Sequence, residues 1–92
     1  MVDKIRCAHI LVEKHSQAIQ VLERMKKGES FADIAKQVSH CSSRKRGGDL
    51  GWFGRGQMVK EFEKAAFSLQ KNQITQEPVK TQFGYHIIKR LE

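Results

Sequence analysis

The chain has 92 residues, of which 39% are hydrophobic and 29% are charged, and its formal net charge is +7. This balance excludes an intrinsically disordered chain, because disordered segments are poorer in hydrophobic residues. A domain of this length buries only a modest core, so any active site is expected to be a shallow cleft, and no large cofactor is expected. With one proline and seven glycines, no long linker is expected, and residues 1–92 are predicted to form a single domain.

The positive charge favours anionic partners, which are nucleic acid, acidic lipid surfaces or acidic segments of client proteins. The basic residues are scattered, however, and only Arg44-Lys45-Arg46 form a tight cluster, so a solvated basic surface is the favoured interpretation. Cys7 and Cys41 are too few for the disulfide framework of a secreted domain, and we interpret them as reduced thiols. The first residues lack a signal-peptide pattern and no apolar run could span a bilayer, so a cytoplasmic location is expected.

A strand is predicted over residues 4–12, which are rich in strand-forming residues. Both faces of this strand are apolar, with Ile5, Cys7, His9 and Leu11 on one face and Ala8, Ile10 and Val12 on the other. A strand with two apolar faces is covered on both sides. We therefore expect it to be a central strand of a sheet.

Two helices are predicted next. The first shows helical spacing at Ala18, Ile19, Leu22 and Met25. Ser16 is its predicted N-cap and Gly28 its stop. The second is predicted to begin at Ser30, because Ser30-Phe31-Ala32-Asp33 has the form of a capping box. Its apolar stripe, interpreted as core, consists of Phe31, Ile34, Ala35 and Val38.

Residues 39–56 are predicted to be loop-like, with a short strand at Leu50-Gly51-Trp52-Phe53, because serines and basic residues lead into several glycines. A third helix is indicated by Val59, Phe62 and Ala66, with Leu69 closing its apolar side. A turn-rich passage over residues 71–78 and a short strand near Val79-Lys80-Thr81 precede a final strand over residues 83–91. Strands at both ends around a helical middle predict an α+β fold with a mostly antiparallel sheet.

Three polar residues occur where packing alone does not require them, namely His9, His86 and Cys41. Histidines in strands are often satisfied core residues, so neither histidine establishes a site by itself. The basic residues Arg44, Lys45 and Arg46 would lower the pKa of the Cys41 thiol if they lay close to it.

Three apolar residues accompany them. Met58 and Phe62 are four residues apart and would share a helix face if the third helix began that early. Taken alone, both would be interpreted as core residues. Phe83 directly precedes Gly84, a position from which it could project from the sheet edge.

Other chemistries find weaker support in the sequence. Gly54-Arg55-Gly56 lacks the third glycine of a dinucleotide-binding motif, and the spacing of cysteines and histidines does not match a structural zinc site, so no metal is expected. A hydrolase built from Cys41 with either strand histidine stays open, although nothing local marks a nucleophile elbow or an oxyanion hole. The single Arg46-Gly47-Gly48 is too little to indicate a specific nucleic-acid partner.

Several ordered blocks of the sequence resemble the parvulin family of peptidyl-prolyl cis/trans isomerases. The first is the opening strand around His9-Ile10-Leu11-Val12, and the last is Phe83-Gly84-Tyr85-His86-Ile87-Ile88. The central blocks are Ser39-His40-Cys41-Ser42-Ser43, Gly47-Gly48-Asp49-Leu50-Gly51-Trp52-Phe53, Arg55-Gly56-Gln57-Met58-Val59 and Phe62-Glu63. The blocks run in order from residue 5 to residue 90, so the resemblance covers almost the whole chain.

This resemblance implies a four-stranded antiparallel sheet surrounded by helices, and isomerase activity without a metal or cofactor. The residues that it implies for catalysis are His9, Cys41, Thr81 and His86. The implied proline pocket consists of Leu50, Met58 and Phe62, with Phe83 at its rim. The loop after the first strand, Glu13-Lys14-His15-Ser16, lacks the basic cluster of the phosphate-specific branch, and the WW domain of that branch is not expected. Strict specificity for phosphorylated Ser/Thr-Pro is therefore not expected.

The predicted function is rotation about Xaa-Pro bonds, which assists protein folding and requires no covalent bond to break. The predicted partners are proline-containing segments of client proteins, with weak association to anionic surfaces, and the chain is expected to be monomeric. Arg44, Lys45 and Arg46 are possible contacts for an acidic residue before the proline, although exposed charges contribute little. Two alternatives stay open: a non-catalytic module that holds proline-containing segments, and a protein of nucleic-acid or membrane surfaces.

Overall fold

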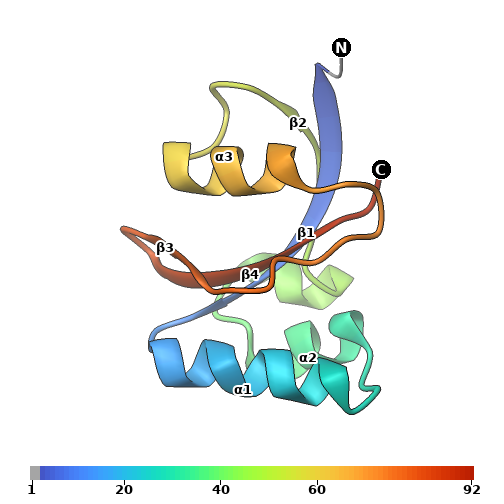
Figure 1. Cartoon of the computed structure of the whole chain (residues 1–92), viewed down its shortest axis with the longest axis vertical. Coiled ribbons are helices and arrows are strands. Elements are labelled where there is room, and N and C mark those ends of the chain that lie inside the picture. Colours follow the sequence, from blue (N-terminus) through green and yellow to red (C-terminus); the bar gives the residue numbers. More distant parts are fainter. Residues whose placement is uncertain (1–2) are drawn as a thin grey trace.

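A computed structural model of the chain describes residues 3–92. Four strands form one antiparallel sheet in the order β2-β1-β4-β3, with α1 and α2 covering one face and α3 the other (Figure 1). The elements are β1 (Lys4–Val12), α1 (His15–Lys26), α2 (Phe31–Val38), the 3₁₀-helix η1 (Ser42–Arg46), β2 (Asp49–Gly54), α3 (Lys60–Ser68), β3 (Val79–Thr81) and β4 (Gly84–Arg90). The expected α+β class and the four-stranded antiparallel sheet surrounded by helices are confirmed.

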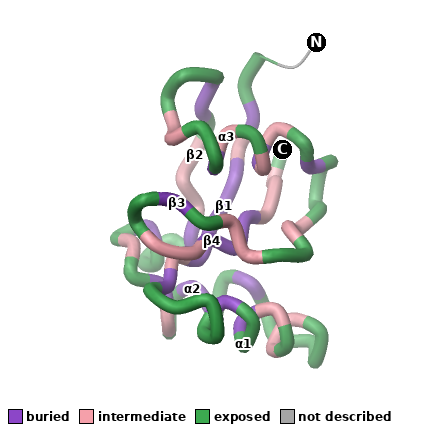
Figure 2. The backbone as a smooth tube through the Cα atoms, turned by 60° about the vertical axis from the view of Figure 1, so that its left-hand side comes forward, coloured by how far each residue is buried: buried purple, intermediate pink, exposed green. Residues whose placement is uncertain are grey.

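The strand β1 is central, as its two apolar faces predict. It pairs with β2 on one side and β4 on the other. The register with β4 places His9 opposite Ile88 and Leu11 opposite His86. Figure 2 shows buried residues along both β1 and β4. The sheet therefore brings the two histidine-bearing strands together at the centre of the molecule.

Two apolar cores lie on opposite faces of the sheet, and the alternation predicted for β1 separates them. The core under α1 and α2 contains Ala8, Ile10, Val12, Ala18, Val21, Phe31, Ile34, Ala35 and Ile87. The core under α3 contains Ile5, Cys7, Phe53, Phe62, Ala66, Leu69 and Ile88. Burial of these side chains supplies the main driving force for folding.

The predicted start of α1 is wrong, whereas its predicted stop is confirmed. Lys14, not Ser16, is the N-cap residue, and its backbone N–H donates to Gln17 Oε1 at 3.1 Å. Because the Gln17 side chain supplies this acceptor, the helix begins one residue before Ser16. At the other end, Gly28 has a φ of +99°, and its N–H donates to the Met25 carbonyl at 3.0 Å. A positive φ favours glycine, which ends the helix in this way.

The second helix begins as predicted, because Ser30 Oγ accepts the Asp33 N–H at 3.4 Å. The segment predicted to be a loop contains η1, a short helix that the serines and basic residues did not reveal. The third helix begins at Lys60, so Met58 precedes it and does not share a helix face with Phe62. The last strand begins at Gly84, since Gln82 and Phe83 form the turn between β3 and β4. Among residues 3–92, no helix has both the length and the apolar character needed to cross a bilayer.

Candidate active site

Two histidines from neighbouring strands face each other inside the molecule. His9 on β1 and His86 on β4 are 5% and 3% exposed, and their Nδ1 atoms lie 2.9 Å apart. Thr81, at the end of β3, lies behind the pair with its Oγ1 2.7 Å from His86 Nε2. Thr81 Oγ1 also accepts the N–H of Phe83 at 3.2 Å. Three strands thus build one continuous chain of polar groups.

Both imidazoles are held in the neutral form at neutral pH. Burial, and to a smaller extent the charge of a protonated His86, lowers the pKa of His9 to about 4. Burial likewise lowers the pKa of His86 to about 4. In a neutral pair one Nδ1 carries a hydrogen and the other a lone pair, so the two atoms can hydrogen bond. His9 Nε2 is buried and has no hydrogen-bond partner among residues 3–92.

The ring of Phe62 on α3 fixes the position of both histidines. Its centroid lies 5.6 Å from that of His9 and 5.3 Å from that of His86, with both ring pairs in edge-to-face orientation. Phe62 is buried and also packs against Phe53 on β2. The polar chain is therefore held against an aromatic wall, which excludes water from one side of it.

A cavity of about 400 Å³ opens beside the histidines and Phe62. Its lining residues come from four elements and their loops: His9, Leu11, Cys41, Leu50, Gln57, Met58, Val59, Phe62, Phe83 and His86. Most of these side chains are apolar. An apolar hollow with a few converging polar groups is the usual form of a small binding site.

The structure places seven of the eight predicted catalytic and substrate-binding residues on the wall of this cavity, and the eighth, Thr81, directly behind His86. The sequence analysis missed Leu11, Gln57 and Val59 as site residues. Leu11 could have been found, because strand alternation places it on the same face as His9. Gln57 and Val59 flank Met58 in the loop before α3. A loop has no regular alternation that would predict which of its side chains face a cavity.

Phe83 and Met58 are positioned by short loops. Phe83 lies in the turn between β3 and β4 and is 60% exposed, so its ring forms part of the rim. In the loop before α3, Gln57 Oε1 accepts the Gly54 N–H at 2.6 Å. This bond ties the loop that carries Met58 to the end of β2.

Cys41 lies at the start of η1 and is partly buried. The segment that carries it returns to β1, where the His9 N–H donates to the Gly48 carbonyl at 2.9 Å. Gly48 has a φ of +89°, and any Cβ at this position would clash with the His9 carbonyl oxygen. A glycine therefore permits the close approach that brings Cys41 beside the cavity.

The basic cluster lies on η1, but within the described part of the chain none of its three residues lines the cavity. Arg46 instead lines a separate hollow of about 210 Å³ together with Asp49. The pKa of Asp49 is lowered mainly by its hydrogen bond from Arg6, and the charge of Arg46 adds to this effect. Contact of Arg44, Lys45 or Arg46 with an anionic substrate stays a prediction.

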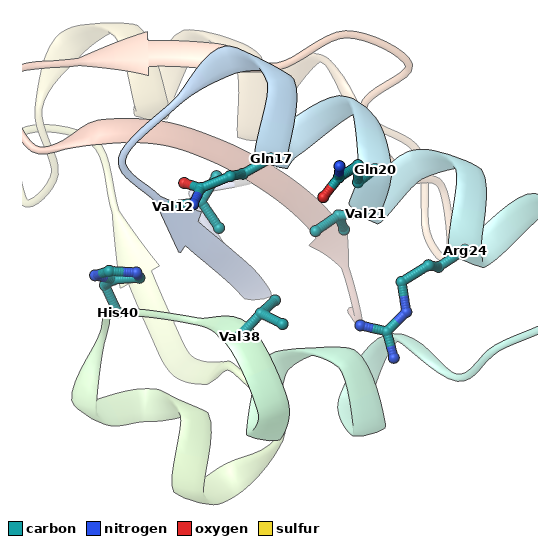
Figure 3. Close-up of a pocket in the computed structure, with 7 residues that line it drawn as sticks. All are labelled: Val12, Gln17, Gln20, Val21, Arg24, Val38 and His40. Carbon is teal, nitrogen blue, oxygen red and sulfur yellow. The ribbon is translucent and has the colours of Figure 1, made fainter.

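A smaller hollow of about 140 Å³ lies between α1, α2 and the end of β1 (Figure 3). Val12, Val21 and Val38 form its apolar side, and Gln17, Gln20, Arg24 and His40 its polar side. The Arg24 guanidinium is already engaged with Glu29 and Gln37, each at 2.7 Å. This hollow is smaller than the histidine-lined cavity, and its one arginine is occupied, so we place the candidate active site at the larger cavity.

Comparisons with known proteins agree with this location. The family model of the PPIC-type PPIase domain (rotamase) matches residues 9–92. The foldase protein PrsA of Bacillus subtilis is 53% identical over 90 residues, which are 97% of this chain and 30% of that protein. The chain thus spans about a third of the length of the curated relatives that it matches.

Solved structures agree as well. PrsA from Bacillus subtilis superimposes with a TM-score of 0.94, over 98% of this chain and 35% of that one. NmPin, the parvulin of Nitrosopumilus maritimus, is 50% identical with a TM-score of 0.88, over 100% of this chain and 99% of that one. The match of the family model, the fold and the cavity lead to one conclusion: this chain belongs to the parvulin family of PPIC-type peptidyl-prolyl cis/trans isomerase domains.

Proposed function

We propose that this chain catalyses cis/trans isomerisation of Xaa-Pro bonds in client polypeptides and so assists their folding. The observation that carries the proposal is the apolar cavity of about 400 Å³ directly beside a buried pair of neutral histidines. Family membership supports the same activity. The chain matches only about a third of the length of its curated relatives. The activity is therefore tested on this chain itself.

The chemistry needs no covalent step. Rotation about the Xaa-Pro amide breaks its resonance, with a barrier of about 18–20 kcal/mol, and takes tens to hundreds of seconds without a catalyst. The protein needs only to bind the twisted amide more tightly than either planar form. Leu50, Met58 and Phe62 are proposed to hold the pyrrolidine ring, with the Phe83 ring at the entrance. An apolar surrounding disfavours the more polar planar amide.

His9, Thr81 and His86 are proposed to form the polar support of the site. Their hydrogen-bonded chain holds the His9 ring at the cavity wall, where its Nε2 has no partner within residues 3–92. Hydrogen-bonding groups at this wall could stabilise the reoriented carbonyl or the pyramidal nitrogen of the twisted amide.

Cys41 is proposed to act as a polar wall beside the substrate carbonyl rather than as a nucleophile. Its thiol lines the cavity, but a non-covalent path suffices for rotation. We expect Cys41→Asp to retain substantial isomerase activity, measured as kcat/KM, because rotation needs no nucleophile at this position. Isolation of an acyl-enzyme adduct on Cys41 from the parent protein would contradict this role.

The substrate is proposed to be an unphosphorylated Xaa-Pro segment. The cavity wall is largely apolar, and the basic cluster on η1 lies outside it. Kinetics with Glu-Pro, Leu-Pro and Arg-Pro peptides of otherwise equal sequence test whether Arg44, Lys45 and Arg46 favour an acid before proline. A small preference for Glu-Pro that disappears at high salt is expected, and a preference for Arg-Pro would refute the contact.

A direct isomerisation assay separates catalysis from simple binding of proline-containing segments. Line-shape analysis or exchange spectroscopy by NMR on a short Xaa-Pro peptide measures the rate with the parent protein, Met58→Ala and His86→Ala. Acceleration by the parent and its loss in both variants support the proposed enzyme. Binding of the peptide without acceleration would instead indicate the non-catalytic holding module.

We further propose a monomer in a reducing compartment such as the cytoplasm. Cys7 and Cys41 are free thiols, and burial raises the pKa of Cys7 to about 11. Persistent free thiols are typical of reducing compartments. Mass spectrometry of the protein alkylated in intact cells tests whether the thiols are reduced. Sedimentation velocity of the purified chain tests whether it is a monomer. Oxidised cysteines in cells, or a dimer at micromolar concentration, would argue against them.

A further inference from the structure

The second half of β1 lacks a strand partner on the side where β2 lies. Among the described residues, the β1–β2 pairing ends at Ala8 opposite Asp49, after a bulge, whereas the pairing with β4 continues to Val12. The backbone groups of His9 and Leu11 on this edge therefore need other partners, because buried N–H and C=O groups are costly to leave unpaired. The His9 N–H is satisfied by the Gly48 carbonyl at 2.9 Å.

Ser39 supplies the partner for Leu11. Its side chain lies in a residue with 0% exposure, and its Oγ accepts the Leu11 N–H at 3.1 Å. The same oxygen accepts the Cys41 N–H at 3.4 Å. The next residue completes the attachment, since the His40 N–H donates to the Leu11 carbonyl at 2.7 Å. The Ser39 hydroxyl thus joins the backbone of β1 at Leu11 to the backbone of Cys41, which lines the cavity.

The attached segment, residues 39–41, takes the place of a strand partner on this edge of β1. Ser39 and Cys41 both have extended backbone angles, with φ and ψ of −67° and 137°, and −90° and 145°. Successive side chains in extended backbone point to opposite sides. His40 accordingly lines the small hollow beside α1 (Figure 3), and Cys41 lines the histidine-lined cavity. Successive side chains of the segment attached at Ser39 thus line two different hollows.

We propose that Ser39 is a positioning residue that holds Cys41 and Leu11 in the wall of the active site. The hydroxyl acts through these two cavity-lining residues and does not line the cavity itself. The catalytic part of this inference rests on the proposed isomerase function, whereas the attachment itself does not. An alanine at this position leaves two backbone N–H groups without their acceptor, so only the His40 N–H still holds the segment to Leu11 and the segment is expected to shift.

The test compares Ser39→Ala with Ser43→Ala. Ser43 is a matched control because it is also buried, at 2% exposure, and lies four residues further along the chain. Its Oγ has no hydrogen-bond partner within residues 3–92. Amide hydrogen exchange followed by NMR is the first measurement. In Ser39→Ala, the Leu11 and Cys41 amides should exchange at least about tenfold faster, as the loss of about 1.4 kcal/mol of protection implies. The His9 amide, bonded to Gly48, is the internal reference and should stay protected.

Two further measurements distinguish positioning from support of the fold. The rate of Cys41 alkylation by iodoacetamide, located by peptide mass spectrometry, should change by at least about threefold in Ser39→Ala, because the surroundings of the thiol change when its segment shifts. A threefold change in rate corresponds to a shift of about RT in the activation barrier. Buried Cys7, with its raised pKa, should not react in the folded protein. The value of kcat should fall by about tenfold with a smaller change in KM, since the proline pocket is left intact. Ser43→Ala should change none of these quantities.

The outcomes that overturn the proposal are distinct. Equal acceleration of exchange at all three amides would mean that Ser39 only stabilises the fold. Freed Leu11 and Cys41 amides with unchanged alkylation and unchanged kcat would refute the positioning role. Should Ser39→Ala not fold, the parent decides: its Leu11 amide must be as protected as that of His9, and rapid exchange there refutes the attachment. If the parent shows no isomerase activity, exchange and alkylation still judge the attachment while the proposed function fails.

Discussion

The Nδ1 atoms of His9 and His86 lie 2.9 Å apart in the interior of the molecule, although 77 positions separate the two residues in the chain. Two protonated imidazoles at this distance would repel each other, and burial penalises each charge separately. The arrangement is therefore most stable while the pair is neutral. This makes both the fold and the site sensitive to acid in a defined range.

We expect the free energy of unfolding to fall as the pH decreases from about 6.5 to 4. The pKa of each histidine is about 4 in the folded protein and near 6.5 when unfolded, so the unfolded chain binds more protons throughout this window. Stability is thus fully present above pH 6.5 and lost on acidification, by about 2–3 kcal/mol for His9 alone at pH 4.5. Urea unfolding at pH 7.5 and 4.5 measures the change.

Asp49 does not interfere with this test, because its pKa is lowered from an ordinary value of 3.8, chiefly by the hydrogen bond from Arg6. Its contribution is lost at still lower pH. An unchanged urea midpoint between pH 7.5 and 4.5 would show that the histidine pair is not destabilised by protonation.

Thr81→Val should reduce both stability and activity. The substitution keeps the shape of a 7% exposed side chain but removes the hydroxyl that partners His86 Nε2 and the Phe83 N–H. We expect a loss of about 1–3 kcal/mol in the free energy of unfolding and a several-fold lower kcat/KM. Thr81→Ser retains the hydroxyl and serves as the control. An unchanged free energy of unfolding and unchanged kcat/KM in Thr81→Val would show that these hydrogen bonds contribute nothing, and any loss in Thr81→Ser reports the missing methyl group.

Met58→Ala should lower kcat/KM by about tenfold or more while the domain stays folded. Met58 is partly buried on the cavity wall, so its truncation removes contacts with the proline ring, and a loss of about 1.4 kcal/mol in the transition state is tenfold in rate. Met25→Ala is a matched control, since Met25 is partly buried against the opposite core. Thermal unfolding and isomerase kinetics on both variants provide the comparison. Equal kinetics for the two would exclude Met58 from the binding site.

Gly48→Ala should destabilise the domain by at least about 3 kcal/mol, because a Cβ would meet the His9 carbonyl oxygen at a positive φ. Gly56→Ala is the control: Gly56 also has a positive φ, of +85°, but nothing lies near its Cβ position. This control should cost only about 1 kcal/mol. Chemical denaturation of both variants measures the difference. Comparable values would mean that the loop can move away from β1 at little cost.

Local spacing in the sequence determined most of the secondary structure. The two apolar faces of residues 4–12 predicted a central strand, and the stripe from Phe31 to Val38 predicted the face of α2 that packs on the sheet. Such patterns are visible in sequence because strand and helix periodicities follow from backbone geometry over a few residues. Element ends were less predictable. The Lys14 N-cap depends on a Gln17 side chain, and η1 forms where the chain turns back onto β1.

The sequence by itself determined which residue types are present for the chemistry, and the ordered blocks around His9, Cys41, Met58 and His86 resemble one family. Only the tertiary structure decided that His9 meets His86, that Thr81 lies behind the pair, and that Ser39 attaches the Cys41 segment to Leu11. The physical reason is the range of the interactions. Periodicity is a property of neighbouring residues, whereas these contacts depend on which strands pair and on where the unpaired edge of β1 finds its hydrogen bonds.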